Sequence, residues 1–135
     1  MFDIDNLNPV ARFYYPGTGK KEWVELRNIP TSELRKLRKK VIRQEVEYYR
    51  PDNTNEKPFR YEVDKIDDEK LFDEMWDYQI VNWKIVKING EEIPCTKENK
   101  LLMVGNSKEF ADWIVKCLNQ LAIDEEKKRD KSEKN

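Results

Sequence analysis

A turn cluster near the N-terminus constrains the fold more than any other feature of the sequence. Residues Pro16-Gly17-Thr18-Gly19 combine the fixed φ of proline with two glycines, a composition that favours a tight change of chain direction. The run before it, 10–15 (VARFYY), is rich in β-branched and aromatic residues, and the run after it, 22–27 (EWVELR), alternates apolar with charged residues. Both patterns are typical of short strands. The sequence therefore predicts an antiparallel β-hairpin here.

Helical periodicity follows the hairpin in two segments. The first is expected to begin with Thr31 or Ser32 as the N-cap and to continue to Arg43. The second begins at Asp64 and is the strongest amphipathic pattern in the chain. Its apolar residues are predicted to lie near one face of a helix: Ile66, Phe72, Met75, Trp76, Ile80 and Trp83.

The remaining segments predict shorter elements and one further helix. Two strand candidates, 46–50 and 59–63, are joined by a polar loop over 51–58. Asn89-Gly90 predicts a tight turn, and a short helix is expected over 97–104. Ser107 is expected to cap a last helix with this apolar face: Phe110, Ala111, Ile114, Cys117, Leu118 and Leu121.

Together these elements predict an α+β fold in which N-terminal antiparallel strands pack with two to three principal amphipathic helices. A chain of 135 residues favours one domain, which we expect to span 1–123. The segment 124–135 contains no apolar residue and has nothing to bury in a core. We therefore expect this charged tail to be disordered or a frayed helix.

The charge composition argues against several classes of partner. Charged residues make up 39% of the chain, against about a quarter in typical domains, but 26 basic and 27 acidic side chains leave a net charge of −1. No overall field therefore attracts nucleic acid or a membrane surface. No apolar run approaches the about 20 residues that span a bilayer, and no apolar signal segment opens the chain, so we expect a cytoplasmic protein.

The absence of histidine excludes several catalytic and metal-binding arrangements. These are the Ser-His-Asp and Cys-His nucleophile pairs and the paired-histidine metal sites. Cys95 and Cys117 lie too far apart in sequence for a zinc half-site or a Cys-x-x-Cys redox pair. Cys95 precedes a helix start, where its thiol pKa would be lowered, but no activating base is placed beside it, and Thr96 is the better cap. Cys117 is expected in the core.

The acidic residues Glu69, Asp73 and Asp77 are the other catalytic candidates. Their i, i+4, i+8 spacing places them on one helix face, where paired carboxylates could transfer protons or hold Mg²⁺ or Ca²⁺. No phosphate cradle or calcium loop accompanies them, so we interpret them as the solvated side of an amphipathic helix. The sequence thus predicts no enzyme, no cofactor and no metal site.

Two further features have competing interpretations. The basic helix 33–43 could bind phosphates in a nucleic-acid-binding adaptor, but the acidic helix after Asp64 offers enough carboxylates to compensate it. The large aromatic residues favour a core, with a protein-binding surface as the alternative. Under that alternative the candidate partner-binding residues are Trp76, Tyr78, Ile80, Trp83, Phe110 and Trp113.

The arrangement of several motifs resembles the tail assembly chaperones of long-tailed phages and prophages. The matching stretches between residues 22 and 123 are EWVELR at 22–27, ELRKLRKK at 33–40, MWDYQIVNW at 75–83, NGEEIPCTKENK at 89–100 and FADWI at 110–114. The chain departs from the family at 84–86 (KIV), where a glycine usually follows the tryptophan.

This resemblance implies a non-catalytic protein that binds the long, apolar, helical tape measure protein and keeps it soluble during tail assembly. A structural minor tail or head–tail connector protein, which would remain in the particle, is the first alternative. The sequence leaves self-association of the chain open.

Overall fold

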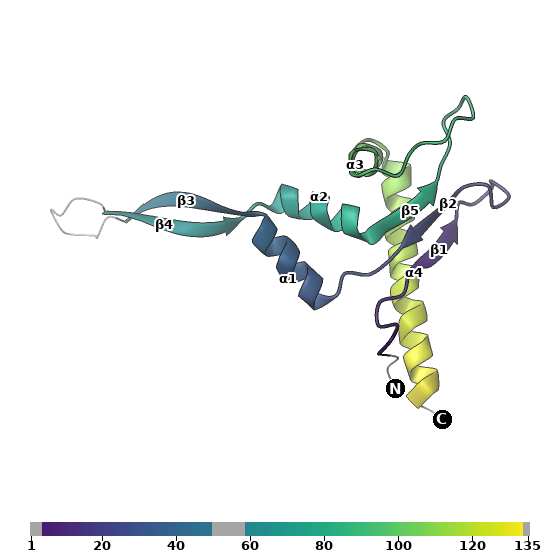
Figure 1. Ribbon diagram of the computed structural model, residues 1–135, viewed down its shortest axis with the longest axis horizontal. Coiled ribbons are helices and arrows are strands. Elements are labelled where there is room, and N and C mark those ends of the chain that lie inside the picture. Colours follow the sequence, from purple (N-terminus) through teal and green to yellow (C-terminus); the bar gives the residue numbers. More distant parts are fainter. Residues whose placement is uncertain (1–3, 50–58, 134–135) are drawn as a thin grey trace.

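The computed structural model describes residues 4–49 and 59–133 and has an α+β architecture (Figure 1). In these residues two small antiparallel sheets combine with four helices, which confirms the predicted fold class. One sheet and the helices form a body. The other sheet is a two-stranded ribbon that projects from the body to one side.

The body contains a three-stranded sheet with β2 (Trp23–Leu26) between β1 (Ala11–Tyr14) and β5 (Ile80–Lys84). Strands β1 and β2 pair antiparallel, which confirms the predicted hairpin. Gly17 and Gly19 in the connecting turn have φ values of 84° and 61°, in the region that glycine enters at least cost. The turn chemistry thus fixes the register of the first two strands.

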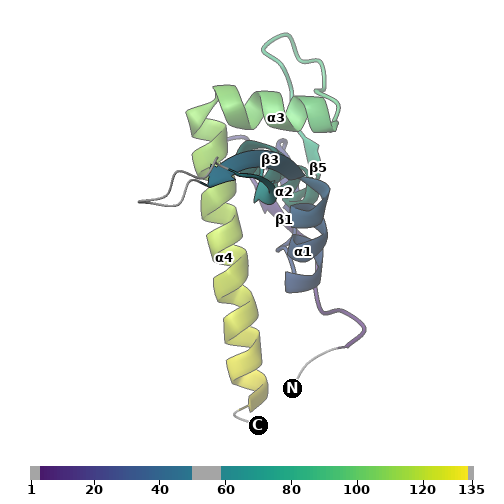
Figure 2. The same ribbon diagram turned by 90° about the vertical axis from the view of Figure 1, so that its left-hand side faces the viewer.

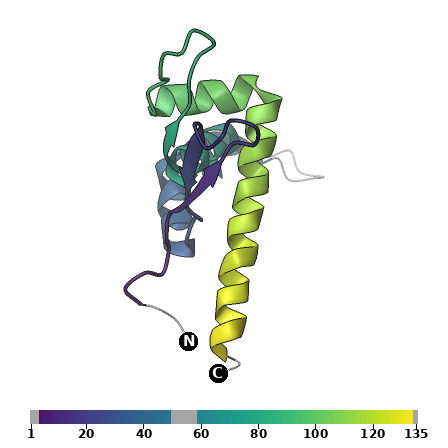
Figure 3. The same cartoon turned by 90° about the vertical axis from the view of Figure 1, so that its right-hand side faces the viewer.

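The core lies between one face of this sheet and the first half of α4 (Lys108–Glu133), which runs beside the sheet in Figure 3. Three aromatic rings meet edge to face within it, with centroids 5.7 Å apart for Trp83–Phe110 and 5.9 Å for Phe110–Trp113. The buried cluster comprises Val24, Leu26, Ile80, Trp83, Ile85, Phe110, Trp113, Ile114 and Cys117.

Helix caps predicted from the sequence begin the last two helices. Thr96 Oγ1 accepts a hydrogen bond from the Asn99 amide at 3.2 Å and starts α3 (Lys97–Asn106). Ser107 Oγ accepts one from the Phe110 amide at 3.1 Å at the start of α4, and α3 crosses the upper end of α4 in Figure 2. The expected turn at Asn89-Gly90 is also present, with Gly90 at a φ of 88°. These local signals were sufficient because each depends on neighbouring residues alone.

The helix predicted to begin at Asp64 and to carry Ile80 and Trp83 is wrong at both ends. Helix α2 (Asp68–Gln79) begins after its N-cap Asp67, and Ile80 and Trp83 belong to β5. Both side chains face the core although they are three residues apart, because the β2–β5 register shifts between Glu25 and Leu26. This irregularity gives the strand an apolar spacing that is typical of a helix.

The first helix ends earlier than predicted and has a different cap. Helix α1 (Thr31–Lys40) has Pro30 at its N-cap position and no side-chain cap, so the expected capping by Thr31 or Ser32 is wrong. The chain leaves the helix at Val41, which is buried, and continues as β3 (Ile42–Tyr49) instead of remaining helical to Arg43. Two consecutive β-branched residues favour this change to a strand.

Strands β3 and β4 (Phe59–Ile66) form the second sheet, an antiparallel ribbon that contains the predicted strand 59–63 and residues 46–49 of the other predicted strand, whose residue 50 lies outside the described residues. The loop predicted over 51–58 lies outside the described residues. At the other end of the chain, α4 continues to Glu133. The charged tail beyond Asp124 is therefore helical up to that residue, which is one of the two forms expected for it.

Candidate partner-binding surfaces

The structure places four of the six candidate partner-binding residues in the core. Ile80, Trp83, Phe110 and Trp113 are each at most 9% exposed, because the sheet and α4 bury their apolar faces against each other. As surface anchors for a partner they are unsuitable in this fold. The interpretation of Trp83 and Trp113 as core residues is confirmed.

Trp76 and Tyr78 on α2 are partly buried. Trp76 packs against the core cluster. The Arg27 guanidinium lies 3.7 Å from the centroid of the Tyr78 ring, and its Nε donates a hydrogen bond to the Tyr78 carbonyl at 2.8 Å. These contacts attach α2 to the end of β2, so Tyr78 also acts mainly within the body.

The acidic side of α2 is held by lysines from two other helices. Glu74 accepts from Lys97 of α3 at 2.5 Å and from Lys40 of α1 at 3.0 Å, and the Lys97 hydrogen bond, followed by that of Lys40, lowers the pKa of its carboxyl. Asp77 accepts from the buried Lys100 at 3.1 Å. The expected charge compensation between α1 and α2 thus occurs at the Lys40–Glu74 pair. The other two lysines that pair with α2, Lys97 and Lys100, come from α3.

The candidate carboxylates lie on α2, whereas Cys117 lies in the buried cluster and Cys95 packs against it. No group of three acidic or cysteine side chains able to hold a metal occurs in residues 4–49 and 59–133. Desolvation raises the pKa of the Cys95 thiol, which is the opposite of what activates a nucleophile. Cys117 is buried in the core as predicted, and burial raises its pKa from 9.0 to about 11.

The raised pKa of Cys117 predicts a pH dependence of stability. Its contribution is fully present below pH 9.0, where the thiol is protonated in both states. As the pH rises from 9.0 to about 11, the unfolded thiol ionises and the buried one does not, so this contribution is lost. Urea unfolding across this range should show a steeper loss for the wild type than for Cys117→Ala, which lacks the thiol. Parallel profiles would contradict the prediction.

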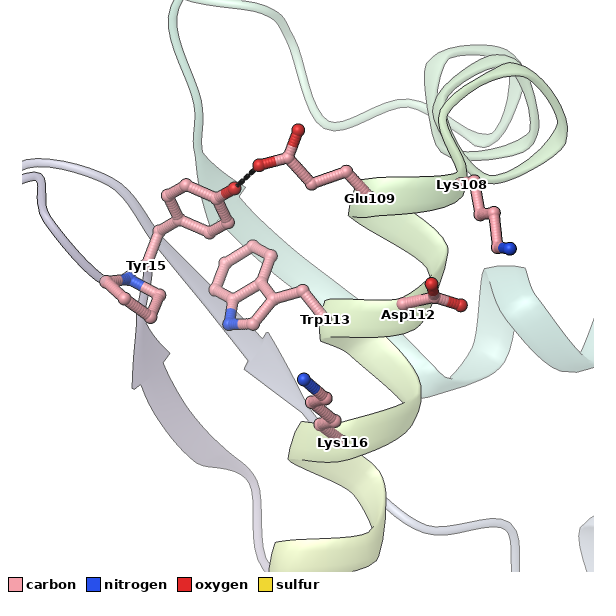
Figure 4. Close-up of a pocket in the computed structure, with 7 residues that line it drawn as sticks. Tyr15, Lys108, Glu109, Asp112, Trp113 and Lys116 are labelled. Atoms are coloured by element: carbon pink, nitrogen blue, oxygen red, sulfur yellow. Dashed lines mark hydrogen bonds between the residues drawn. The ribbon is translucent and has the colours of Figure 1, made fainter.

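A shallow depression lies between the turn after β1 and the first turns of α4 (Figure 4). Its volume is about 540 Å³, and the Tyr15 hydroxyl donates to the Glu109 carboxylate at its edge, which raises the pKa of Tyr15. The lining residues are Tyr15, Pro16, Lys108, Glu109, Asp112, Trp113 and Lys116. Two lysines and two carboxylates leave this depression without a preference for a ligand of either charge.

The β3–β4 ribbon carries several exposed apolar side chains on one projecting element. Its strands pair with each other from Ile42–Ile66 to Tyr49–Phe59, and no third strand in the described residues joins them. The ribbon extends away from the sheet and α4 in Figure 1 and points toward the viewer in Figure 2. An isolated two-stranded ribbon is marginally stable in water, which suggests that something else supports it.

One face of the ribbon, the charged face, is a ladder of ion pairs. Lys65 Nζ lies 2.9 Å from Glu47 and 3.8 Å from Glu45, and Arg43 lies 3.0 Å from Glu45. The Tyr61 hydroxyl donates to Glu47 at 3.0 Å, and the Lys65 hydrogen bond, followed by that of Tyr61, lowers the pKa of Glu47. This face satisfies its own charges.

The opposite face, the apolar face of the ribbon, exposes four large side chains. Ile42, Val46 and Ile66 are 41–43% exposed, and Tyr48 is 68% exposed. The cross-strand register places polar residues among them: Gln44, Arg60, Glu62 and Asp64. The Gln44–Asp64 pair separates Ile42 and Ile66 from Val46 and Tyr48, so the face carries two exposed apolar patches bordered by polar residues. Exposed apolar patches of this kind are candidate binding sites. No prediction from the sequence included this surface, although alternate apolar residues in 42–48 (IRQEVEY) were a signal of a two-faced strand.

Comparisons with known proteins found no match for this chain. No family model matches the sequence, and neither a curated protein nor a solved structure is similar to it. In the part of the chain that the structure describes, no helix is long and apolar enough to cross a membrane.

Proposed function

We propose that the protein is a non-catalytic tail assembly chaperone of a long-tailed phage or prophage. In this role it binds the apolar, helical tape measure protein and keeps it soluble. The apolar face of the ribbon carries the proposal, because it exposes large side chains on an element that the core does not need. The motif resemblance between residues 22 and 123 is the second support.

The physical chemistry of the chain suits this task. A binder of apolar helices needs an accessible apolar face, since burial of that face against the helix drives association. It also needs a charged exterior that keeps the loaded complex in solution, and 39% of this chain is charged with both signs interspersed. Glu74 and Asp77 are engaged in ion pairs and both thiols in packing, which favours binding over catalysis.

Co-expression with a candidate tape measure protein tests the proposal. We expect the wild type to increase the soluble yield of the tape measure protein several-fold. Tyr48→Lys combined with Ile66→Lys should abolish the increase, because both substitutions place charge on the apolar face. A matched control, Leu102→Lys with Val115→Lys, changes exposed apolar residues of α3 and α4 and should retain it.

Equal yields with and without the wild-type protein would contradict the proposed function. If the ribbon variant and the control variant lose the increase in soluble yield equally, the loss comes from a general effect of added charge and not from the apolar face of the ribbon. Mass spectrometry of purified particles separates the remaining alternative, because a connector or minor tail protein stays in the particle.

A further inference from the structure

The outer edge of β3 offers backbone groups that no described residue pairs. The Asp67 amide donates to the Val41 carbonyl at 3.1 Å, and the β3–β4 register continues from this pair. Hydrogen-bonded pairs alternate along an antiparallel ladder, so the odd-numbered residues of β3 direct their N–H and C=O groups toward β4. The even-numbered residues Ile42, Gln44 and Val46 therefore direct theirs outward.

We propose that two copies of the chain pair through this edge, antiparallel about a two-fold axis at Gln44, and form a four-stranded sheet. The stretch 42–46 (IRQEV) is complementary to itself in that register. Arg43 lies opposite Glu45 of the second copy, Ile42 lies opposite Val46 of the second copy, and the two Gln44 residues face each other. Opposite charges and apolar pairs at directly facing positions each stabilise a sheet.

The neighbouring registers place like charges together. An axis at Glu45 pairs Arg43 with Glu47 twice but also brings the two Glu45 side chains face to face. An axis at Val46 places Glu45 opposite Glu47 twice. Like-charge pairs destabilise a sheet, so the charges favour the register with its axis at Gln44 over these two neighbours.

The outer edge of β4 is a poorer candidate. An axis at Tyr61 would pair Arg60 with Glu62, but the sequence has a proline at position 58, directly before the strand. Proline has no N–H to donate, so a ladder of hydrogen bonds along this edge would stop there. The β3 edge has no proline between Ile42 and Tyr49.

Pairing through β3 also enlarges the apolar face of the ribbon. The two-fold axis is perpendicular to the sheet, so the apolar faces of both copies lie on the same side. Ile66, Ile42 and Val46 of the second copy then form a row of three adjacent apolar side chains, and symmetry repeats the row. The use of this joined face by a tape measure helix depends on the proposed function, whereas the pairing itself does not.

Charge exchange tests the pairing in the full-length chain. Light scattering should give the wild type twice the chain mass of 16.3 kDa. Arg43→Glu and Glu45→Arg should each reduce the mass to 16.3 kDa, because each places like charges opposite one another. The double variant Arg43→Glu/Glu45→Arg restores opposite charges and should recover the dimer. A monomeric wild type, or single variants that remain dimeric, would overturn the proposal.

A cysteine placed on the axis tests the register. Directly opposite residues of a hydrogen-bonded antiparallel pair have Cα atoms about 5.5 Å apart, within the span of a disulfide. In a Cys95→Ser background, Gln44→Cys should give a crosslinked dimer on oxidation, and Val46→Cys should not. Crosslinking at position 46 alone would overturn the register. A dimer that fails to raise tape measure solubility would reject the proposed function and leave the pairing intact.

Discussion

Replacing Trp83 with alanine is expected to lower the free energy of unfolding by about 3–5 kcal/mol. The indole is 5% exposed and packs edge to face on Phe110 with ring centroids 5.7 Å apart. Its Nε1 donates a hydrogen bond to the Ile93 carbonyl at 2.7 Å, which ties the segment after β5 to the sheet. The substitution removes the packing and this hydrogen bond together, so it should cost more than loss of either alone.

Urea unfolding followed by circular dichroism measures the loss, and two variants resolve its parts. Trp83→Phe keeps a ring in the core but leaves the Ile93 carbonyl without its donor, so a loss of about 1–2 kcal/mol is expected. Trp23→Ala is the matched control, because Trp23 is partly buried on β2 and stacks with Arg12 at 3.8 Å on the opposite side of the sheet. A loss for Trp83→Ala no larger than for Trp23→Ala would show that the core lies elsewhere.

The elements that the sequence predicted correctly are those that short-range signals determine. The β1–β2 hairpin follows from its proline–glycine turn, and the caps at Thr96 and Ser107 start α3 and α4 where their hydroxyls can accept amide hydrogen bonds. Cys117 lies on the buried stripe of α4 because helical periodicity determines that stripe. Each of these signals lies within a few residues of the structure that it predicts.

The incorrect prediction for the residues of β5 and the missed surface depend on contacts between distant residues. Ile80 and Trp83 have helical spacing, and only the register shift against Glu25 and Leu26, more than fifty residues earlier, turns them both inward on a strand. The exposed face of the ribbon could not be predicted for the same reason, because it depends on distant parts of the chain. The sequence indicated strands around Val46 and Tyr61, but whether another element covers them depends on the whole fold. The alternative that placed aromatic residues on a binding surface therefore named side chains that the fold buries, and the exposed ribbon was not among the candidates.

Replacing Asp77 with alanine is the second substitution with a large expected effect. The Lys100 ammonium group donates to Asp77 Oδ1 and to the Asp77 carbonyl, both at 3.1 Å, and the Lys100 side chain is 10% exposed. Without the carboxylate, a largely buried positive charge keeps only a carbonyl partner. Removal of one partner of a fully buried pair costs about 3–5 kcal/mol. Because the Asp77 side chain is 32% exposed, we expect about 2–3 kcal/mol here.

Lys100→Met tests whether the Lys100–Asp77 ion pair itself stabilises the fold or whether only an unpaired Lys100 would destabilise it. Methionine fills a similar volume without a charge, and replacement of a buried ion by an apolar residue is often nearly neutral. We therefore expect Lys100→Met to cost less than Asp77→Ala, and the double variant to cost no more than Lys100→Met, since the stranded ammonium is then gone. Glu69→Ala, exposed on the same helix, is the control and should change stability by at most about 0.5 kcal/mol. Equal costs for Asp77→Ala and Glu69→Ala in urea unfolding would show that the carboxylate does not hold α2 against α3, and would return Asp77 to the solvated side of its helix.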